Sequence, residues 1–295
     1  MTALQWNVAL PPGYRRGDVL AFHGRDQQGV AEQVSADRLR KGIMHDGLCV
    51  AFEIAFGPQQ ASCTADIDGA PAPGMAAALH AAVRNMLGLR IDPQPFAQLV
   101  ANDALMAPLV AANPGLRIVQ SATPFEALTW AIIGQQINLA FAIALRRTFI
   151  EQAGRRHSSG LWCYPEAQQA AQLNPEELTS RKFSRAKAET VLRLAALVTD
   201  GSLVLALPAG GDVAGISQAL LAVKGIGPWT VNYALLRGYG YADCSLHGDV
   251  AIRAALQKLL GEDSKPDMAR TEQWLRRYAP QRTMACAHLW ASLQN

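Results

Sequence analysis

The sequence predicts an α+β protein, in which an N-terminal domain with an antiparallel sheet plus helices is followed by a larger all-α domain. Three observations predict this fold class. Residues 50–56 and 61–67 alternate apolar and polar side chains, as strands with one buried face do. From about residue 100, apolar residues recur at the three-to-four spacing of helices. Finally, 295 residues are enough for two separate cores.

The N-terminal domain is expected to span residues 1–115. Its two predicted strands, residues 50–56 and 61–67, are followed by the turn-rich stretch DGAPAPG at residues 68–74. A helical run covers residues 75–89 and ends before the break at residues 91–95, IDPQP. The boundary with the second domain is placed at Asn113-Pro114-Gly115, a turn-forming tripeptide.

The second domain, residues 116–295, is expected to be helical throughout. Pro124 begins the first run, which is predicted to continue to Ile150. Ser184 is a favourable N-cap for a run that ends at Thr199. Further helical runs are predicted at residues 213–223, 229–239, 249–260, 268–278 and 283–293.

Composition indicates a soluble protein of a reducing cytoplasm. Half of the residues are hydrophobic, and the mean hydropathy is +0.05. The first residues lack a basic segment followed by an apolar core, and no apolar run reaches membrane-spanning length, so neither a signal peptide nor a membrane partner is expected. The five cysteines are scattered, without a C-x-x-C pair, which argues against disulfides, structural zinc and a Cys-ligated cluster.

Positive charge is concentrated in the second domain. Residues 1–115 contain 8 Lys+Arg and 10 Asp+Glu, a net charge of −2, whereas residues 116–295 contain 19 and 14, a net charge of +5. This asymmetry is expected of a domain that contacts a phosphate backbone. Charge alone fits an ordinary soluble surface equally well.

Two glycines and a proline separate two apolar helical runs at Lys224-Gly225-Ile226-Gly227-Pro228. A dinucleotide-binding fingerprint is excluded, because a helix rather than a strand precedes the glycines and Thr230 stands in place of the third glycine. A tight turn fits, since glycine allows a close backbone approach and proline suits the first helical position. The free N–H groups of the second helix would then bind an anion such as a DNA phosphate. The alternative is an ordinary connection between two helices.

Aromatic and acidic residues follow this turn. Trp229 and Tyr233 lie one helical turn apart on a shared face, and Asp249 stands where a loop becomes a helix. Taken alone, an aromatic pair at this spacing is more often core packing than a binding surface, and an aspartate before a helix is a favoured N-cap. Their order and spacing together are more specific.

The stretch LLAVKGIGPWTVNY, from Leu220 to Tyr233, followed by a loop and Asp249, resembles the helix-hairpin-helix, glycine/proline-rich loop, aspartate motif of base-excision DNA glycosylases. Within that superfamily the sequence is most similar to the 3-methyladenine DNA glycosylase II (AlkA type) branch. The resemblance extends over most of the chain, to the stretches at residues 125–137, 183–187 and 287–290. An α+β N-terminal domain is also typical of this branch.

The resemblance implies an enzyme that flips a damaged base out of double-stranded DNA and hydrolyses its N-glycosidic bond. Asp249 would be the catalytic carboxylate, stabilising the positive charge that develops on the sugar. The expected base pocket comprises Trp229, Tyr233, Trp290, Phe22 and Leu139. The expected DNA contacts are Gly225, Gly227, Lys224, Thr230, Gln135 and Gln136, the two glutamines filling the gap that the flipped nucleotide leaves. Backbone carbonyls of Leu221, Val223 and Ile226 are expected to hold a Na⁺ or K⁺ ion at the hairpin.

Two features of the sequence exclude other branches of this superfamily. Relatives that also cleave the DNA backbone carry a nucleophilic lysine where this sequence has Trp229, so the resemblance implies a monofunctional glycosylase. Relatives with an iron–sulfur cluster carry four clustered cysteines near the C-terminus, where this chain has only Cys286. The resemblance thus implies that no cofactor is required. The protein is also expected to be a monomer.

The sequence also departs from the family pattern. Ser245-Leu246-His247-Gly248 precedes Asp249 in place of a more usual F-P-x-x, Val250 and Ala251 replace larger pocket-wall residues, and Gln136 stands where a relative inserts leucine. Alkylated bases of the 3-methyladenine and 7-methylguanine type are the expected substrates. Two alternatives stay open: a preference for oxidised or deaminated bases, and a non-catalytic helix-hairpin-helix protein that only binds DNA.

Overall fold

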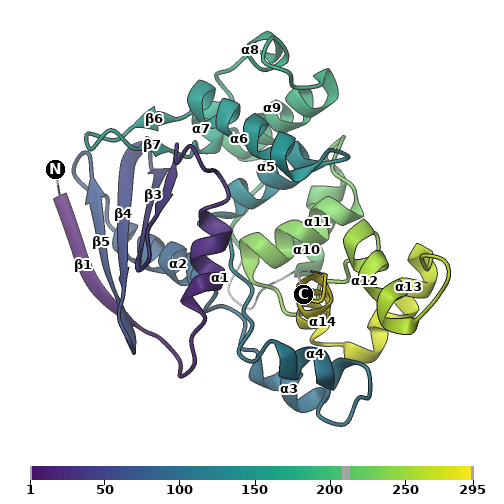
Figure 1. Cartoon of the computed structure of the whole chain (residues 1–295). Coiled ribbons are helices and arrows are strands. Elements are labelled where there is room, and N and C mark those ends of the chain that lie inside the picture. The colour runs from purple at the N-terminus through teal and green to yellow at the C-terminus, as the bar shows by residue number, and fades with distance from the viewer. Residues whose placement is uncertain (1, 208–210, 212, 294–295) are drawn as a thin grey trace.

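The computed structural model describes residues 2–207, 211 and 213–293. A five-stranded antiparallel sheet forms one side of the molecule and helices form the other (Figure 1). The order across the sheet is β1-β5-β4-β3-β2. Its strands are β1 (Thr2–Ala9), β2 (Glu32–Val34), β3 (Arg38–His45), β4 (Leu48–Phe56) and β5 (Gln60–Ile67). The α+β fold class expected from the sequence is confirmed.

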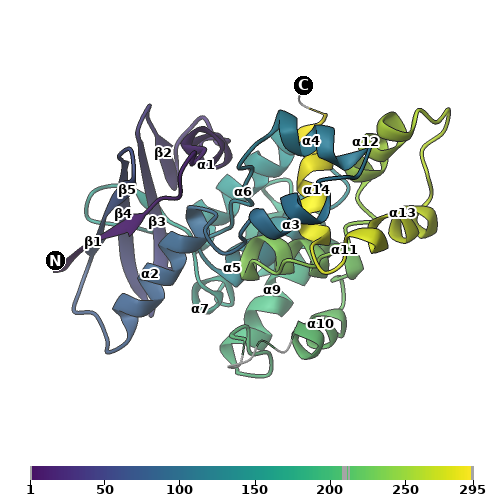
Figure 2. The same ribbon diagram turned by 90° about the horizontal axis from the view of Figure 1, so that it is seen from below.

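The two strands predicted by alternation are confirmed as β4 and β5. In β5 every second residue is buried, from Ala61 to Ile67, as the pattern required. Helix α2 (Met75–Met86) follows and packs on the sheet through buried residues such as Leu79 and Val83 (Figure 2). It ends three residues before the predicted Leu89.

Two long strands, β1 and β3, were not predicted. In β3 the segment RLRKGIMH appears polar in sequence, yet Lys41 is only 1% exposed and its charge is compensated inside the molecule. A buried ion pair hides the amphipathic pattern on which strand prediction depends.

Helices form most of the remaining structure. Those preceding residue 116, besides α2, are α1 (Arg16–His23), α3 (Gln94–Leu99) and α4 (Met106–Ala112). Those following it are α5 (Pro124–Gly134), α6 (Leu139–Ala153), α7 (Ala167–Ala170), α8 (Pro175–Thr179), α9 (Arg185–Thr199), α10 (Val213–Leu221), α11 (Pro228–Ala234), α12 (Val250–Leu260), α13 (Met268–Leu275) and α14 (Arg282–Ala291). Helices α3 and α4 lie beside α14, far from the sheet (Figure 2).

Three predictions for the helical part need correction. The run expected from Pro124 to Ile150 is two helices, α5 and α6, because Gln136 adopts a left-handed φ of 56° and the Asn138 side chain caps a new helix by accepting the Phe141 N–H. A two-stranded hairpin, β6 (Arg155–Arg156) and β7 (Trp162–Cys163), interrupts the helices, so the part is not helical throughout. The run at residues 229–239 continues from α11 as a π-helical turn, Leu235–Tyr239.

The predicted start and end of α9 are confirmed. The Ser184 hydroxyl caps α9 by accepting the Lys187 N–H, and α9 ends at Thr199 as expected. All five cysteines are buried free thiols. In the part of the chain that the structure describes, no helix is long and apolar enough to cross a bilayer.

The sheet and the helical part are joined by backbone pairing. Tyr164, just after β7, accepts a bond from the Met44 N–H (2.8 Å) and donates its own N–H to the Gly42 carbonyl (2.9 Å). A side chain at Gly42 would collide with the Trp162 backbone, so this close approach requires glycine. The pairing brings the sheet against α5, whose residues Phe125–Ile133 are all buried.

A buried group of four charged residues spans the same junction, and we call it the ion cluster (Glu32, Lys41, Glu126 and Arg146). The Lys41 amine bonds Glu32 at 2.8 Å and Glu126 at 2.6 Å, and the Arg146 guanidinium bonds them at 2.7 and 2.8 Å. Burial would raise the pKa of both carboxyls, but the Arg146 and Lys41 charges outweigh it and hold each pKa below its usual range. Two positive and two negative charges therefore balance inside the fold.

Candidate active site

Asp249 is the N-cap of α12, as the sequence predicted. Its Oδ1 atom accepts the backbone N–H groups of Ala251 (2.9 Å) and Ile252 (3.0 Å). These bonds satisfy donors that have no partner within the helix and fix the carboxylate at the positive end of the helix dipole.

Two tryptophans hold the same carboxylate. The Trp229 indole donates to Oδ2 at 2.9 Å, and the Trp290 indole donates to Oδ1 at 3.3 Å. An ionised carboxylate accepts all four bonds, and Oδ2, which accepts only one among the described residues, keeps lone pairs for a positive centre. Sequence reasoning expected these tryptophans to act through their faces; the structure adds that their N–H edges position Asp249.

Two further aromatic residues, Tyr233 and Trp130, pack in the same cluster as Trp229. The Tyr233 ring lies 5.2 Å from the Trp229 ring at a 30° tilt, and its hydroxyl accepts the Trp130 indole N–H at 2.9 Å. Trp130 was not predicted, because α5 is apolar on every face and its sequence does not distinguish the side directed at the site.

A cavity of about 630 Å³ opens next to this cluster. Its lining comes from α1 and the residues next to it, from residues 116–119, from the π-helical turn after α11, and from α14. Of the five predicted pocket residues, Phe22, Leu139 and Trp290 line it, while Trp229 and Tyr233 pack beside Trp290 in one aromatic cluster. Its size is within the usual range of small-molecule sites. The lining also includes Arg25 and Arg237, which sequence reasoning did not assign to the pocket.

The predicted hairpin connects α10 to α11. Gly225 has a φ of 97°, and a side chain there would collide with Thr190 of α9. Both the backbone conformation and the lack of space therefore require glycine at this position. Gly227 is the N-cap of α11, with Pro228 at the first helical position as expected. A Cβ at Gly227 would meet nothing within 4 Å, so the start of α11 faces open space.

The loop between α5 and α6 contacts the hairpin. The Gln135 amide donates to the Gly225 carbonyl (3.2 Å) and to the Thr230 hydroxyl (2.9 Å), and the Lys187 amine donates to the Gln135 carbonyl (2.7 Å). Gln135 thus joins two segments, and the buried Thr230 could meet a phosphate only through its backbone N–H. Gln136 is exposed.

The predicted cation site consists of backbone carbonyls at the same turn. The Val223 carbonyl accepts the Ile226 N–H at 3.0 Å and keeps a second lone pair. Leu221 ends α10, where the last carbonyls have no partner within the helix. Hard oxygen donors of this kind suit Na⁺ or K⁺, so the residues fit the ion that the sequence led us to expect.

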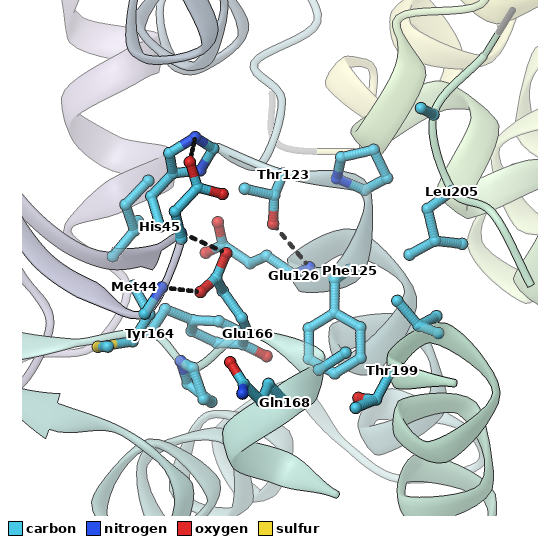
Figure 3. Close-up of a pocket in the computed structure, with 18 residues that line it drawn as sticks. Met44, His45, Thr123, Phe125, Glu126, Tyr164, Glu166, Gln168, Thr199 and Leu205 are labelled. Carbon is cyan, nitrogen blue, oxygen red and sulfur yellow. Dashed lines mark hydrogen bonds and ion pairs between the residues drawn. The ribbon is translucent and has the colours of Figure 1, made fainter. Parts of the chain in front are cut away.

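A second cavity, of about 600 Å³, lies beside β3 and the start of α5 and does not include Asp249 (Figure 3). Ligand atoms of His45, Asp46 and Glu166 there lie within 4.8 Å of one another. Both Glu166 oxygens, however, accept backbone N–H groups of the β3–β4 turn, from Asp46 and Gly47 at 3.0 Å each. Glu166 therefore has a structural role.

Two family models match successive parts of the chain. A family model described as HhH-GPD superfamily base excision DNA repair protein matches residues 129–281, and one described as the AlkA N-terminal domain matches residues 7–122. Among solved structures, a 3-methyladenine DNA-glycosylase from Archaeoglobus fulgidus has a TM-score of 0.81 at 20% identity, covering 98% of both chains. That likeness shows a shared fold.

Two relatives are similar in sequence. A DNA-3-methyladenine glycosylase of Bacillus subtilis (strain 168) is 31% identical over 178 residues, which are 59% of this chain and 59% of that protein. DNA-3-methyladenine glycosylase 2 of Escherichia coli (strain K12) is 31% identical over 218 residues, 73% of this chain and 72% of that protein. The match thus spans about three-fifths of the Bacillus protein and nearly three-quarters of the Escherichia one. The chain belongs to the HhH-GPD superfamily of base excision DNA repair proteins and carries an AlkA-type N-terminal domain.

Proposed function

We propose that this protein is a monofunctional DNA glycosylase that flips alkylated bases, of the 3-methyladenine and 7-methylguanine type, out of duplex DNA and hydrolyses their N-glycosidic bonds. The observation that carries the proposal is the Asp249 carboxylate, held by two backbone and two indole donors, one of which belongs to Trp290 in the lining of the 630 Å³ cavity. The names of the Bacillus and Escherichia relatives point to the same lesions.

The geometry fits the chemistry of base release. As the bond between base and sugar breaks, positive charge develops on the sugar ring. A preorganised carboxylate stabilises that charge, and the lone pairs of Asp249 Oδ2 are available for it. The same oxygen could orient the attacking water.

The hairpin would bind the phosphate backbone of the DNA. The first N–H groups of α11 have no partner within the helix and would bind one phosphate, since the space beside Gly227 is open and Lys224 is exposed nearby. The Gly225 turn would hold the loop in shape. A Na⁺ or K⁺ ion on the carbonyls of Leu221, Val223 and Ile226 would add positive charge there. Gln136, exposed at the tip of its loop, would fill the space left by the flipped nucleotide, while Gln135 anchors that loop.

The absence of lyase chemistry rests on Trp229. Where lyase relatives place a lysine, this residue offers an indole N–H that is bonded to Asp249. An indole cannot form the Schiff base through which such enzymes cut the backbone. The product would be an intact abasic site, and since one chain supplies every group named here, we infer that the monomer is active.

The test is to incubate the protein with methylated, uracil-containing and oxidised DNA and to identify the free bases by mass spectrometry. Release of 3-methyladenine and 7-methylguanine supports the proposal, and release of only another base selects that preference instead. Binding without release of any base would identify a non-catalytic DNA-binding protein. Borohydride added during the reaction should trap no enzyme–DNA adduct, and an efficient adduct would contradict the monofunctional assignment.

A further inference from the structure

Two arginines occupy the aromatic faces of the candidate pocket. The Arg25 guanidinium carbon lies 3.9 Å from the centre of the Phe22 ring, and that of Arg237 lies 4.7 Å from the same ring. Arg237 also lies 5.7 Å from the Trp290 ring. Both arginines line the 630 Å³ cavity. Positive groups therefore already sit against the rings that a flipped base would approach.

Neither arginine forms a salt bridge with a carboxylate among the residues that the structure describes, and the Glu32 carboxylate acts on Arg25 only through its charge, from beyond hydrogen-bond distance. The Arg25 Nε atom donates to the Phe22 carbonyl at 2.7 Å, and an Arg237 terminal nitrogen donates to the Val119 carbonyl at 2.5 Å. The Arg237 Nε atom is buried without a hydrogen-bond partner, while the Tyr233 side chain interacts with the same guanidinium group. Burial lowers the pKa of both guanidiniums, which nevertheless stay protonated because arginine starts far above neutrality.

The charge of the damaged base decides how such a pocket receives it. A base alkylated at N3 or N7 carries a positive charge and is repelled by guanidiniums in a partly desolvated site. An uncharged base that carries carbonyl and ring-nitrogen acceptors would instead receive hydrogen bonds from them.

Departure of the base adds a second effect. When the N-glycosidic bond breaks, the base keeps the bonding electron pair, and the sugar is left with the positive charge. A cationic base thus leaves neutral and leaves easily, whereas an uncharged base leaves as an anion and needs stabilisation. A guanidinium beside the base supplies that stabilisation where the charge develops.

We propose that Arg25 and Arg237 are specificity-determining residues that favour uncharged bases with acceptor groups, such as the deaminated purine hypoxanthine, relative to cationic alkylpurines. This inference rests on the proposed glycosylase function and refines its substrate range. It assigns the two arginines a part in binding the base and in stabilising it as it leaves.

The test compares duplexes that carry a single hypoxanthine or a single 7-methylguanine. Single-turnover rates are measured for the wild type, Arg237→Gln, Arg237→Lys and the double variant Arg25→Gln/Arg237→Gln. The quantity of interest is the hypoxanthine rate divided by the 7-methylguanine rate, since comparing variants cancels the intrinsic difference in leaving ability. Arg237→Gln should lower this ratio about 10-fold or more, as loss of one electrostatic donor does. The double variant should lower it further.

Arg237→Lys keeps the charge and should keep most of the ratio, which a purely structural role for the guanidinium would not predict. As a control for general loss of positive charge, the exposed Arg38→Gln should leave the ratio unchanged. Thermal unfolding checks that each variant is folded.

The outcomes separate the two proposals. If both rates fall by the same factor in folded Arg237→Gln, or if the ratio rises, the specificity inference is wrong and the glycosylase assignment stands. If the wild type releases neither base nor any other, the proposed function itself fails.

Discussion

Two groups of buried positive charge lie within the same junction, and they differ in how they are compensated. In the ion cluster, Lys41 and Arg146 each bond Glu32 and Glu126, so charge and hydrogen bonds are matched. In the pocket, Arg25 and Arg237 face aromatic rings and backbone carbonyls instead. Both groups combine residues from the sheet part and from the helical part of the chain.

The difference indicates that the charges of the ion cluster stabilise the fold, whereas those of the pocket are available to bind a ligand. A compensated buried network fixes how two parts pack, and its cost appears when one member is removed. Uncompensated donors in a cavity destabilise the empty protein and are satisfied only when a partner arrives. Each prediction below disturbs one side of this contrast, in order of decreasing effect.

The largest effect is expected from Lys41→Met in the ion cluster. The substitution leaves Arg146 alone between two buried carboxylates, and breaking a buried pair typically costs about 3–5 kcal/mol of the free energy of unfolding. Urea unfolding measures it. The matched control is Arg38→Met on the same strand, whose exposed ion pair with Glu53 should contribute about 0–1 kcal/mol. Equal costs for the two variants would show that the cluster does not hold the fold.

Asp249→Asn should produce the next largest effect, on activity alone. Asparagine keeps the N-cap, so folding and DNA binding should survive, while the negative charge facing the sugar is lost. The single-turnover rate of base release should fall on the order of 100-fold or more, less for N7-alkylated purines, which leave easily. Asp267→Asn, which alters the N-cap of α13, is the control and should keep the rate. Excision at the wild-type rate by Asp249→Asn would reduce that residue to a helix cap.

A smaller effect is expected from pH, through His23 beside the ion cluster. Burial lowers the pKa of this imidazole from 6.5, despite the nearby Glu32, so the folded state keeps it neutral while the unfolded state takes up a proton. Stability is thus fully present above pH 6.5 and is lost as the pH falls towards the lower folded pKa, by at most about 1.4 kcal/mol per pH unit for one group. His288, whose pKa burial lowers to about 4, acts in the same direction.

Unfolding free energies at pH 7.5 and 5.5 test this. His23→Gln should flatten the decline relative to the wild type. The carboxyls Glu32 and Glu126 affect only the range below about pH 4.5, where their lowered pKa values lie. An unchanged slope in His23→Gln would mean that this histidine is charged in the fold.

The smallest effect is expected at Gln136, which is exposed in the loop between α5 and α6. Gln136→Ala should slow base release only several-fold, because flipping loses one filling side chain but no charge. Gln136→Leu should be tolerated or improve the rate, since an apolar side chain can insert as a wedge between base steps. If both variants match the wild type in single-turnover rate, another residue fills the gap.

Local sequence patterns predicted those parts of the molecule whose causes are local. Alternation identified β5, a serine identified the start of α9, and an aspartate before an apolar run identified the start of α12. The hairpin was equally readable, because its glycines and proline act on their own backbone.

Features that depend on distant partners were not predictable in this way. β3 was missed because Lys41 is compensated by Glu126, 85 residues away in sequence. The bonds from Trp229 and Trp290 to Asp249 span 20 and 41 residues, and no spacing rule joins them. The two arginines of the pocket face Phe22 only because α1 and the segment after α11 meet in space. Pattern identified the catalytic candidate, and only the fold shows what surrounds it.

The pairing of Tyr164 with Gly42 and Met44 bears on how the chain can be divided. On one side of β3, β2 pairs with Leu39, Arg40 and Lys41, and Tyr164 of the helical part pairs further along at Ile43. Expressed without that part, the sheet would present the unpaired backbone of β3 together with Lys41 and Glu32, now lacking Glu126 and Arg146. Open strand edges promote association between chains. The two halves, although matched by separate family models, are therefore expected to unfold together in a single transition and to aggregate when produced apart.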